Sequence, residues 1–244
     1  MNMNMKFGTW AEIPTPYATH IMAKAGFDFS IIDMEHGVID FETAQDMIFA
    51  AHAEQKEAYI RVPEITEAWT LRCLDMGCDG IVFPGVTSKE DVEKIIEFAM
   101  FPPAGKRGFN PYIAAGGYTS VSEEYFEQEN KRIKLAVILE GREAFDRLED
   151  LLAFEEIAVF YIGQYDLSAA LGVPGDVTNP EVLQYMDKAV RAINAHGKMA
   201  GCMVHSAAEA KQVMGQGFSF VAYKVDSGLL YDAVSRFVKE VSEK

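Results

Sequence analysis

Short apolar runs alternate with longer segments of helical character along the whole chain. The runs are continuously apolar, as in parallel strands that are buried on both faces of a sheet. Eight occur, at Lys6–Trp10, Phe29–Asp33, Ala58–Val62, Gly80–Pro84, Lys134–Glu140, Ala158–Gly163, Met199–Val204 and Phe218–Lys224. Eight strand–helix repeats predict an α/β fold, a (β/α)8 TIM barrel, as a single domain over residues 1–244. The alternative is an open doubly wound sheet, although no G-x-G-x-x-G sequence follows the first run.

Capping signals predict where several helices begin and end. Thr87–Glu90 and Ser206–Glu209 both have the Ser/Thr-x-x-Glu pattern of a capping box. Asn179–Pro180 places a capping residue directly before a proline at the first helical position. Gly77 and Gly197 follow helical stretches and predict helix ends.

One long connection interrupts this rhythm. Residues Pro102–Arg132 are rich in glycine and proline and follow the fourth expected helix. Long loops at the C-terminal face of a barrel usually shape its active site, so we expect this segment to do so. A second loop of this kind is expected at Leu171–Asn179.

Charge and composition exclude several classes of function. The chain has 22 basic and 37 acidic residues, a formal net charge of −15, and no visible basic cluster. We therefore expect neither a nucleic-acid partner nor attachment to an anionic membrane. No apolar run is long enough to span a bilayer, and Met1–Lys6 lacks the pattern of a secretion signal. We expect a cytoplasmic protein whose three cysteines, Cys73, Cys78 and Cys202, are reduced, buried thiols.

Two carboxylates follow neighbouring strands. Glu140 ends the fifth run and Asp166 follows the sixth. The C-terminal strand ends of such a barrel meet at one rim, which is where its active site lies. Two carboxylates there can hold a hard divalent cation when water and substrate complete its coordination. The alternative is that both side chains cap the helices that follow.

A histidine and an arginine are expected at the same rim. His36 lies in an Asp-Met-Glu-His-Gly turn after the second run, and it is a candidate proton relay or a hydrogen-bonded loop residue. Arg61 ends a buried strand, where an unpaired guanidinium is costly. It therefore pairs with a carboxylate inside the protein or binds an anionic ligand. His205, near the seventh run, stays unassigned.

Motifs from Phe7 to Val238 resemble those of one enzyme family. They are Gly8-Thr9-Trp10, Asp33-Met34-Glu35-His36, Arg61-Val62-Pro63, Leu74–Pro84, Pro102–Gly108, Glu140, Ile162-Gly163 with Asp166-Leu167-Ser168, and Val225-Asp226. In order and spacing the chain resembles the HpcH/HpaI-type class II pyruvate aldolases, such as 4-hydroxy-2-oxoheptanedioate and 2-dehydro-3-deoxygalactarate aldolases. These belong to the phosphoenolpyruvate/pyruvate superfamily of barrels. The resemblance implies a lyase that reversibly cleaves a 4-hydroxy-2-oxo acid into pyruvate, or a related 2-oxo acid, and an aldehyde.

The resemblance also implies residue roles and an assembly. Glu140 and Asp166 would bind Mg²⁺, Mn²⁺ or Co²⁺, which chelates the 2-oxo acid. Arg61 would stabilise the enolate. His36 would transfer protons together with Asp75 from the same or a neighbouring subunit. The family implies a homohexamer, a trimer of dimers, with C-terminal helices exchanged between subunits.

Several residues depart from the family pattern near the expected substrate. Gln164-Tyr165 replaces Pro-Ala, Ile138 replaces Gln, and Lys224 replaces a small residue. The resemblance implies that the main chain around Gly163 binds the pyruvate carboxylate. The departures suggest a different oxoacid or an anionic aldehyde half. We expect the substrate to contact Gly163, Gln164, Tyr165, Met203 and Lys224.

Other readings stay open at this point. Lys224 would be the nucleophile of a Schiff-base aldolase on the same barrel, or an ordinary salt-bridged lysine. The barrel would alternatively bind an oxoacid without cleaving it. Claisen-type cleavage of an acyl-CoA is a further alternative, although no basic patch is visible for the phosphates of CoA.

Overall fold

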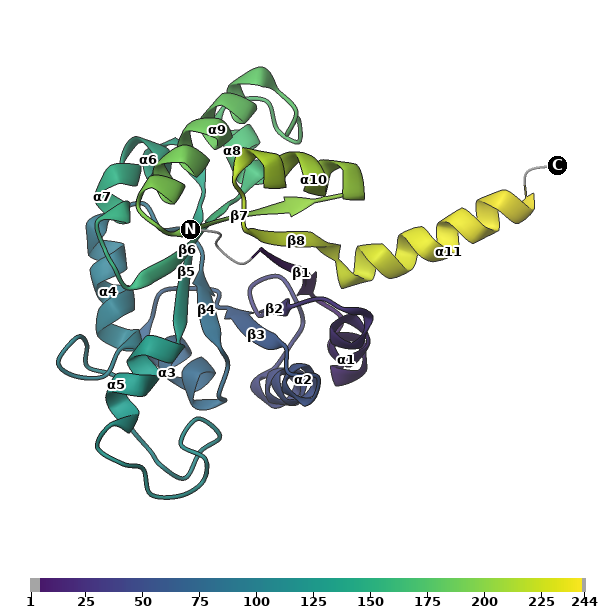
Figure 1. Ribbon diagram of the computed structural model, residues 1–244. Helices are drawn as coiled ribbons and strands as arrows, with labels where there is room; N and C mark the ends of the chain where they lie inside the picture. The colour runs from purple at the N-terminus through teal and green to yellow at the C-terminus, as the bar shows by residue number, and fades with distance from the viewer. Residues whose placement is uncertain (1–4, 243–244) are drawn as a thin grey trace.

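A closed barrel of eight parallel strands forms the centre of the molecule (Figure 1). The computed structural model describes residues 5–242. Neighbouring strands pair in sequence order, and β8 pairs with β1 to close the barrel. The strands are β1 (Lys6–Ala11), β2 (Phe29–Asp33), β3 (Glu57–Arg61), β4 (Gly80–Phe83), β5 (Lys134–Leu139), β6 (Ile157–Ile162), β7 (Met199–Val204) and β8 (Phe220–Val225). The predicted TIM barrel is confirmed, with strand bounds within two residues of those expected.

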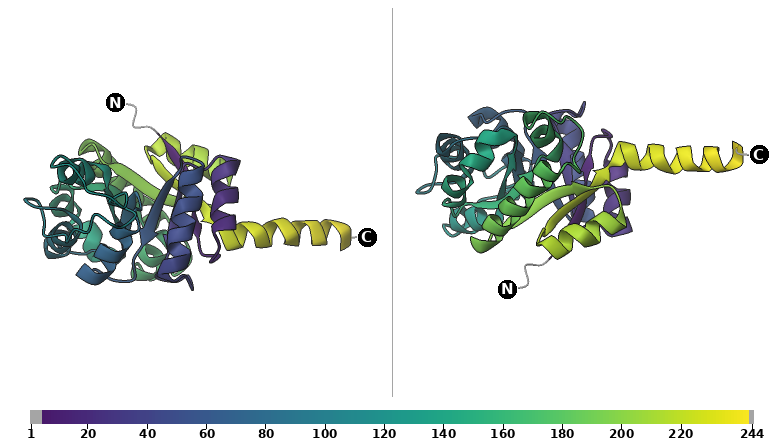
Figure 2. Two further views of the ribbon diagram at one scale, coloured as in Figure 1. Left: turned by 90° about the horizontal axis from the view of Figure 1, so that it is seen from below. Right: turned by 90° about the horizontal axis from the view of Figure 1, so that it is seen from above.

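Helices surround the barrel. They are α1 (Pro16–Ala25), α2 (Phe41–Ala53), α3 (Glu67–Asp75), α4 (Lys89–Ala99), α5 (Tyr125–Arg132), α6 (Gly141–Asp146), α7 (Leu148–Leu152), α8 (Gln164–Ala170), α9 (Pro180–Ala195), α10 (Ala207–Gln216) and α11 (Asp226–Ser242). The last of them, α11, projects away from the barrel (Figures 1 and 2). Among residues 5–242, no helix is both long and apolar enough to cross a membrane.

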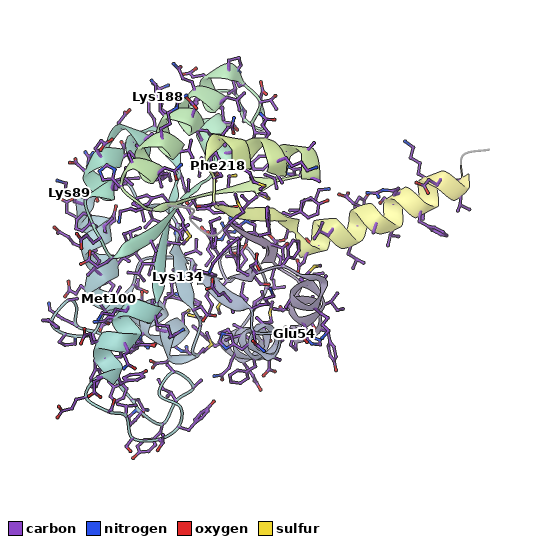
Figure 3. All side chains as sticks on the ribbon, viewed as in Figure 1. Glu54, Lys89, Met100, Lys134, Lys188 and Phe218 are labelled. Atoms are coloured by element: carbon purple, nitrogen blue, oxygen red, sulfur yellow. The ribbon has the colours of Figure 1, made fainter. Side chains whose placement is uncertain are left out.

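The molecule has two separate apolar cores. The larger lies between the strands and the surrounding helices, and the smaller consists of strand residues alone. Members of the smaller core alternate along their strands, which places them inside the barrel. Figure 3 shows how densely side chains fill the space inside and around the strands. The interior of the barrel is therefore a packed core and not a channel.

Tyr161 forms part of the upper layer of the barrel interior. Its hydroxyl oxygen accepts a hydrogen bond from Trp10 Nε1 at 2.9 Å. The neighbouring strand has Gly201 beside the ring, where a Cβ atom would lie 2.6 Å from Tyr161 Cδ2. The absence of a side chain at Gly201 thus lets Tyr161 hold Trp10 directly beneath the rim.

The capping predictions hold in part. Asn179 and Ser206 cap α9 and α10 as expected. The capping box of α4 begins one residue later than predicted, because Ser88 rather than Thr87 is the N-cap and Asp91 is its partner. In α10, Glu209 accepts a hydrogen bond from the main-chain N–H of His205 instead of that of Ser206.

The long connection lies at the opposite end of the barrel from the one predicted. It follows α4, contains α5, and leads into β5 at Lys134. A segment that leads into a strand of a parallel barrel lies at the N-terminal strand ends, whereas active sites form at the C-terminal ends. The prediction that Pro102–Arg132 shapes the active site is therefore wrong for the pocket of the same chain.

The three cysteines are buried and free, as predicted. Burial raises the pKa of Cys78 to about 12, and it also raises the pKa values of Cys73 and Cys202. A thiol reacts through its thiolate, so these side chains are packing residues rather than nucleophiles.

Candidate active site

A pocket of about 480 Å³ opens at the C-terminal ends of the strands. Its walls come from the loops after β1, β2, β5 and β6 and from the ends of β3, β7 and β8. It is lined by Trp10, Glu12, Glu35, His36, Arg61, Ile138, Glu140, Tyr161, Ile162, Gly163, Gln164, Tyr165, Asp166, Met203 and Val225. Eight of the ten site residues expected from the sequence line this pocket. Asp75 and Lys224 do not.

Two carboxylates and an aromatic ring hold Arg61 in place in the lining of the pocket. Its Nε donates to Asp33 Oδ1 at 2.8 Å, and its terminal nitrogen pairs with the other oxygen of Asp33. A second terminal nitrogen lies 3.1 Å from Glu35 Oε2. The guanidinium carbon stands 4.5 Å above the ring centre of Trp10. Of the two readings left open for Arg61, the structure shows the pairing with internal carboxylates, and this pairing fixes the orientation of the guanidinium.

Asp33 also shapes the turn that carries His36. The Asp33 side chain is fully buried, and its Oδ1 accepts hydrogen bonds from the main-chain N–H groups of Glu35 and His36 at 3.0 and 3.2 Å. His36 itself is exposed and lines the pocket. One buried carboxylate thus positions both the guanidinium and the candidate proton carrier.

Glu140 and Asp166 lie on the pocket wall after β5 and β6. Glu140 occupies the N-cap position of α6 and Asp166 lies in the first turn of α8, but neither side chain makes a capping hydrogen bond, which removes the alternative that both serve as helix caps. Instead, Glu140 Oε1 accepts a hydrogen bond from Gly85 N at 2.9 Å. Burial raises the pKa of Glu140, and the negative charges of Asp166 and Glu35 raise it further. The carboxylates of Glu140 and Asp166 are therefore close enough to repel each other.

This donor set fits a hard divalent cation. Residues 5–242 contain no group of three or more His, Cys, Asp or Glu side chains that would hold a metal alone. The two carboxylates supply oxygen ligands, and a cation between them would relieve their mutual repulsion. A chelating substrate and water would supply the remaining ligands. Such a partly open donor set suits a metal that must bind the reactant.

Asp75 lies at the opposite end of the barrel from the pocket. It ends α3, and this helix returns the chain toward the N-terminal strand ends. Its carboxylate lies 3.6 Å from the buried guanidinium of Arg107 in the long connection. A pairing of Asp75 with His36 inside one chain is therefore wrong. A pairing across two subunits stays a prediction.

Lys224 points away from the pocket because β8 is irregular at its end. Gly8 and Trp10 of β1 pair with Ala222 and Val225 of β8, so one extra residue is inserted in β8. Lys224 adopts a left-handed conformation with φ 53°. This turn brings Val225 to the pocket and leaves the Lys224 ammonium paired with Asp232 of α11. The placement of Lys224 among the substrate contacts was wrong, and the salt-bridge reading is confirmed.

Gln164 joins two strand ends on the far wall of the pocket. It is the first residue of α8, is buried, and donates from Nε2 to the main-chain oxygen of Met203. The beginning of α8 is therefore fixed to the end of β7. Tyr165, the next residue, is 45% exposed at the mouth of the pocket.

Sequence reasoning missed Glu12 and the role of Asp226. Glu12 follows β1 and lines the pocket, and burial together with the charges of Asp33 and Asp226 raises its pKa. Asp226 is buried and accepts hydrogen bonds from the main-chain N–H groups of Glu12 and Ile13. The position of Glu12 directly after the first strand was the available signal.

Comparison with known proteins agrees with the residue-level resemblance. A family model described as HpcH/HpaI aldolase/citrate lyase matches residues 6–233. The 5-keto-4-deoxy-D-glucarate aldolase of Shigella dysenteriae serotype 1 (strain Sd197) is 29% identical over 232 residues, which cover 95% of this chain and 90% of that protein.

Two solved structures share the fold at similar identity. An HpcH/HpaI aldolase from Desulfitobacterium hafniense DCB-2 is 26% identical with a TM-score of 0.94, and the match covers 99% of this chain and 94% of that one. Citrate synthase SbnG is 27% identical with a TM-score of 0.90, covering 98% and 94% of the two chains. The match therefore extends over the whole barrel.

Proposed function

This chain belongs to the HpcH/HpaI aldolase/citrate lyase family and is a lyase, and on that premise we propose its reaction. It cleaves a 4-hydroxy-2-oxo acid between C3 and C4, giving pyruvate or a related 2-oxo acid and an aldehyde. The reaction is reversible and depends on a divalent cation, Mg²⁺, Mn²⁺ or Co²⁺. The curated relatives named as aldolases support the reaction class.

The proposal rests chiefly on the convergence of Glu140, Asp166 and Arg61 in one pocket. They follow β5 and β6 and end β3, and hydrogen bonds or ion pairs with neighbouring protein groups position Glu140 and Arg61. Cleavage next to a hydroxyl-bearing carbon leaves an electron pair that must enter an enolate. A site for this reaction needs fixed positive charge where that enolate oxygen forms.

Glu140 and Asp166 would hold the cation. When bound, it acts as a Lewis acid that draws electron density from the keto oxygen of the 2-oxo acid. Arg61 supplies a second positive charge toward the same oxygen. Its orientation costs nothing during the reaction, since Asp33 and Glu35 already hold the guanidinium in place.

His36 would carry the protons. As the C3–C4 bond breaks, the imidazole accepts the proton of the hydroxyl group on C4. The oxygen of that hydroxyl becomes the aldehyde oxygen. The electron pair of the broken bond forms the enolate, and a proton delivered to C3 then gives the methyl group of pyruvate. An exposed imidazole at the mouth of the pocket can exchange that proton with water.

A direct test measures pyruvate release from a panel of 4-hydroxy-2-oxo acids, with Mg²⁺, Mn²⁺ or Co²⁺ and with EDTA. We expect release that stops with EDTA and returns when metal is added. Borohydride should not inactivate the enzyme in the presence of substrate, because Lys224, the lysine at the end of β8, is paired with Asp232. Metal-independent release that borohydride traps would support the Schiff-base alternative. Oxoacid binding without release under any condition would support a barrel that binds and does not cleave.

We further propose that the protein is a homo-oligomer in which α11 packs on a second copy. Only Asp226 of this helix is buried. Its exposed apolar residues recur at helical spacing, at Leu230, Val234, Phe237 and Val241. An apolar groove of about 510 Å³ beside α10 is lined by Phe7, Phe27, Val204, Ala210, Met214 and Tyr223 among others. We propose that the apolar stripe of α11 in one copy packs into the apolar groove of a second copy.

Charges placed on this stripe should dissociate the oligomer. For the double variant Val234→Asp with Phe237→Asp, we expect the mass in solution to fall to that of the 27.1 kDa chain, because each aspartate would have to be desolvated in an apolar groove. Light scattering after size-exclusion chromatography measures this mass. Glu240→Ala, on the same helix, is the control and should keep the wild-type mass. An unchanged mass for the double variant would contradict the proposal.

A further inference from the structure

A chain of three polar side chains lies at the mouth of the pocket and takes no part in the chemistry described above. The hydroxyl of Tyr165 lies 3.1 Å from Nε2 of His205, within hydrogen-bond distance. Nδ1 of His205 lies 3.6 Å from Oε2 of Glu209, and the same oxygen accepts the main-chain N–H of His205 at 2.7 Å. The chain links the beginning of α8 to the loop after β7 and to α10.

These contacts restrain the Tyr165 side chain although the residue is 45% exposed. Gln164 fixes the main chain next to it by its hydrogen bond to Met203 O. His205 meets the phenol edge-on, with ring centroids 6.2 Å apart and planes at 86°. A hydroxyl held in this way is preorganised to make a further hydrogen bond to a ligand in the pocket.

The charges in the pocket limit what that ligand group can be. Within residues 5–242, the charged side chains that line it are four carboxylates and one guanidinium, those of Glu12, Glu35, Glu140, Asp166 and Arg61. The guanidinium is already paired with Asp33 and Glu35. A divalent cation would offset two negative charges, and the carboxylate of the 2-oxo acid would add one back. Apart from His36, to which the proposed reaction assigns proton transfer, no described lining residue is left to neutralise a second carboxylate on the aldehyde half.

We propose that this pocket selects substrates whose aldehyde half is uncharged and carries a hydroxyl group, and that the Tyr165 hydroxyl binds that group. The proposal rests on the proposed function and names the substrate class of the same site. Tyr165 is a specificity-determining residue, and His205 and Glu209 are positioning residues that act through it. An anionic aldehyde half, suggested by the sequence alone, is disfavoured by the acidic lining.

The test uses aldehydes of matched size in the synthetic direction. The full-length enzyme is assayed with pyruvate and Mg²⁺ against glycolaldehyde, propionaldehyde and glyoxylate. The first two have the same number of heavy atoms and differ in a hydroxyl in place of a methyl group, and glyoxylate adds a negative charge. We expect kcat/KM for glycolaldehyde to exceed that for each of the others by about tenfold or more, since a site built to bind a hydroxyl discriminates against substrates without one.

Variants connect this preference to Tyr165. Tyr165→Phe should lower kcat/KM for glycolaldehyde by about tenfold, the loss of one well-placed hydrogen bond, and should leave propionaldehyde unchanged. His205→Gln should produce a smaller change in the same direction. Tyr185→Phe removes a phenol hydroxyl outside the pocket lining and should change neither value.

The failure of this proposal differs from the failure of the proposed function. An active enzyme that prefers glyoxylate or propionaldehyde would overturn the proposal and leave the aldolase assignment intact. Equal losses with both neutral aldehydes in Tyr165→Phe would assign this residue a purely structural role and would also overturn it. Absence of reaction with every aldehyde and every metal would overturn the proposed function, and the present proposal with it.

Discussion

Glu140→Gln or Asp166→Asn is expected to abolish pyruvate release, with a loss of about 1,000-fold or more in kcat. Removal of one electrostatic stabiliser of a developing oxyanion commonly costs about 100- to 1,000-fold, and loss of a ligand charge also weakens cation binding. The amide keeps the shape of the carboxylate, so the pocket should keep its form. Kinetics with Mn²⁺ at increasing concentrations measure the loss and any rescue.

Stability provides a second measurement for the same variants. Burial and the neighbouring carboxylates raise the pKa of Glu140. At pH values above the ordinary pKa of a glutamate, the ionised Glu140 side chain therefore lowers the stability of the folded state. Without metal, Glu140→Gln should melt at the same temperature as the wild type or higher. Added Mn²⁺ should raise the Tm of the wild type and not that of the variant.

A control separates this effect from general loss of charge. Glu149 lies on α7 with its side chain 76% exposed, outside the pocket lining. Glu149→Gln should keep full activity and the metal-induced rise in Tm. Full activity of either pocket variant would reject Glu140 and Asp166 as the metal-binding residues.

Arg61→Ala is expected to lower both activity and stability. The fall in kcat should be about 100-fold or more, since a fixed cation at the enolate oxygen is lost. The free energy of unfolding should also fall by about 3–5 kcal/mol, because Asp33 is fully buried and would lose its ion pair. Steady-state kinetics and chemical denaturation measure the two losses separately.

A double variant distinguishes the two roles of Arg61. Asp33→Asn in combination with Arg61→Ala removes both charges, and the Asn oxygen can still accept the main-chain N–H groups of Glu35 and His36. We expect most of the stability to return and the activity to stay low. Recovery of activity together with stability would show that Arg61 serves folding alone.

The sequence was sufficient for the fold because its signals are local. Each buried strand is a continuous apolar run, and caps such as Asn179 and Ser206 satisfy helix ends through contacts a few residues away. Once the strands were assigned, four residues at the rim could also be predicted: Glu140, Asp166, His36 and Arg61. The C-terminal ends of the parallel strands all lie at that rim.

The wrong predictions concern Lys224, Asp75 and the Pro102–Arg132 connection, and they have two different causes. The extra residue in β8 turns Lys224 onto α11, and no local pattern distinguishes such a bulge from a regular strand end. Asp75 and the Pro102–Arg132 connection lie at the N-terminal strand ends, which follows from their place after a helix. Assigning them to the rim ignored the direction in which the chain runs there.

The contacts between distant loops could not be predicted from one sequence. Tyr165 and His205 are 40 residues apart and meet only because β6 and β7 are neighbours. Four carboxylates act on Arg61, those of Asp33, Glu35, Glu140 and Glu12, and they come together only because their strand ends meet at one rim. Their combined charge becomes visible only in the folded pocket.

Exchange of the pyruvate methyl protons with deuterium tests the central claim most directly, because it reports enolate formation without requiring the aldehyde to be known. The protein is incubated with pyruvate in D₂O, and the methyl signal is followed by NMR with Mg²⁺, with EDTA, and with Mg²⁺ restored. We expect exchange that requires the metal and is lost in Glu140→Gln. Exchange that persists in EDTA, or none with any metal, would contradict a metal-dependent enolate at this site.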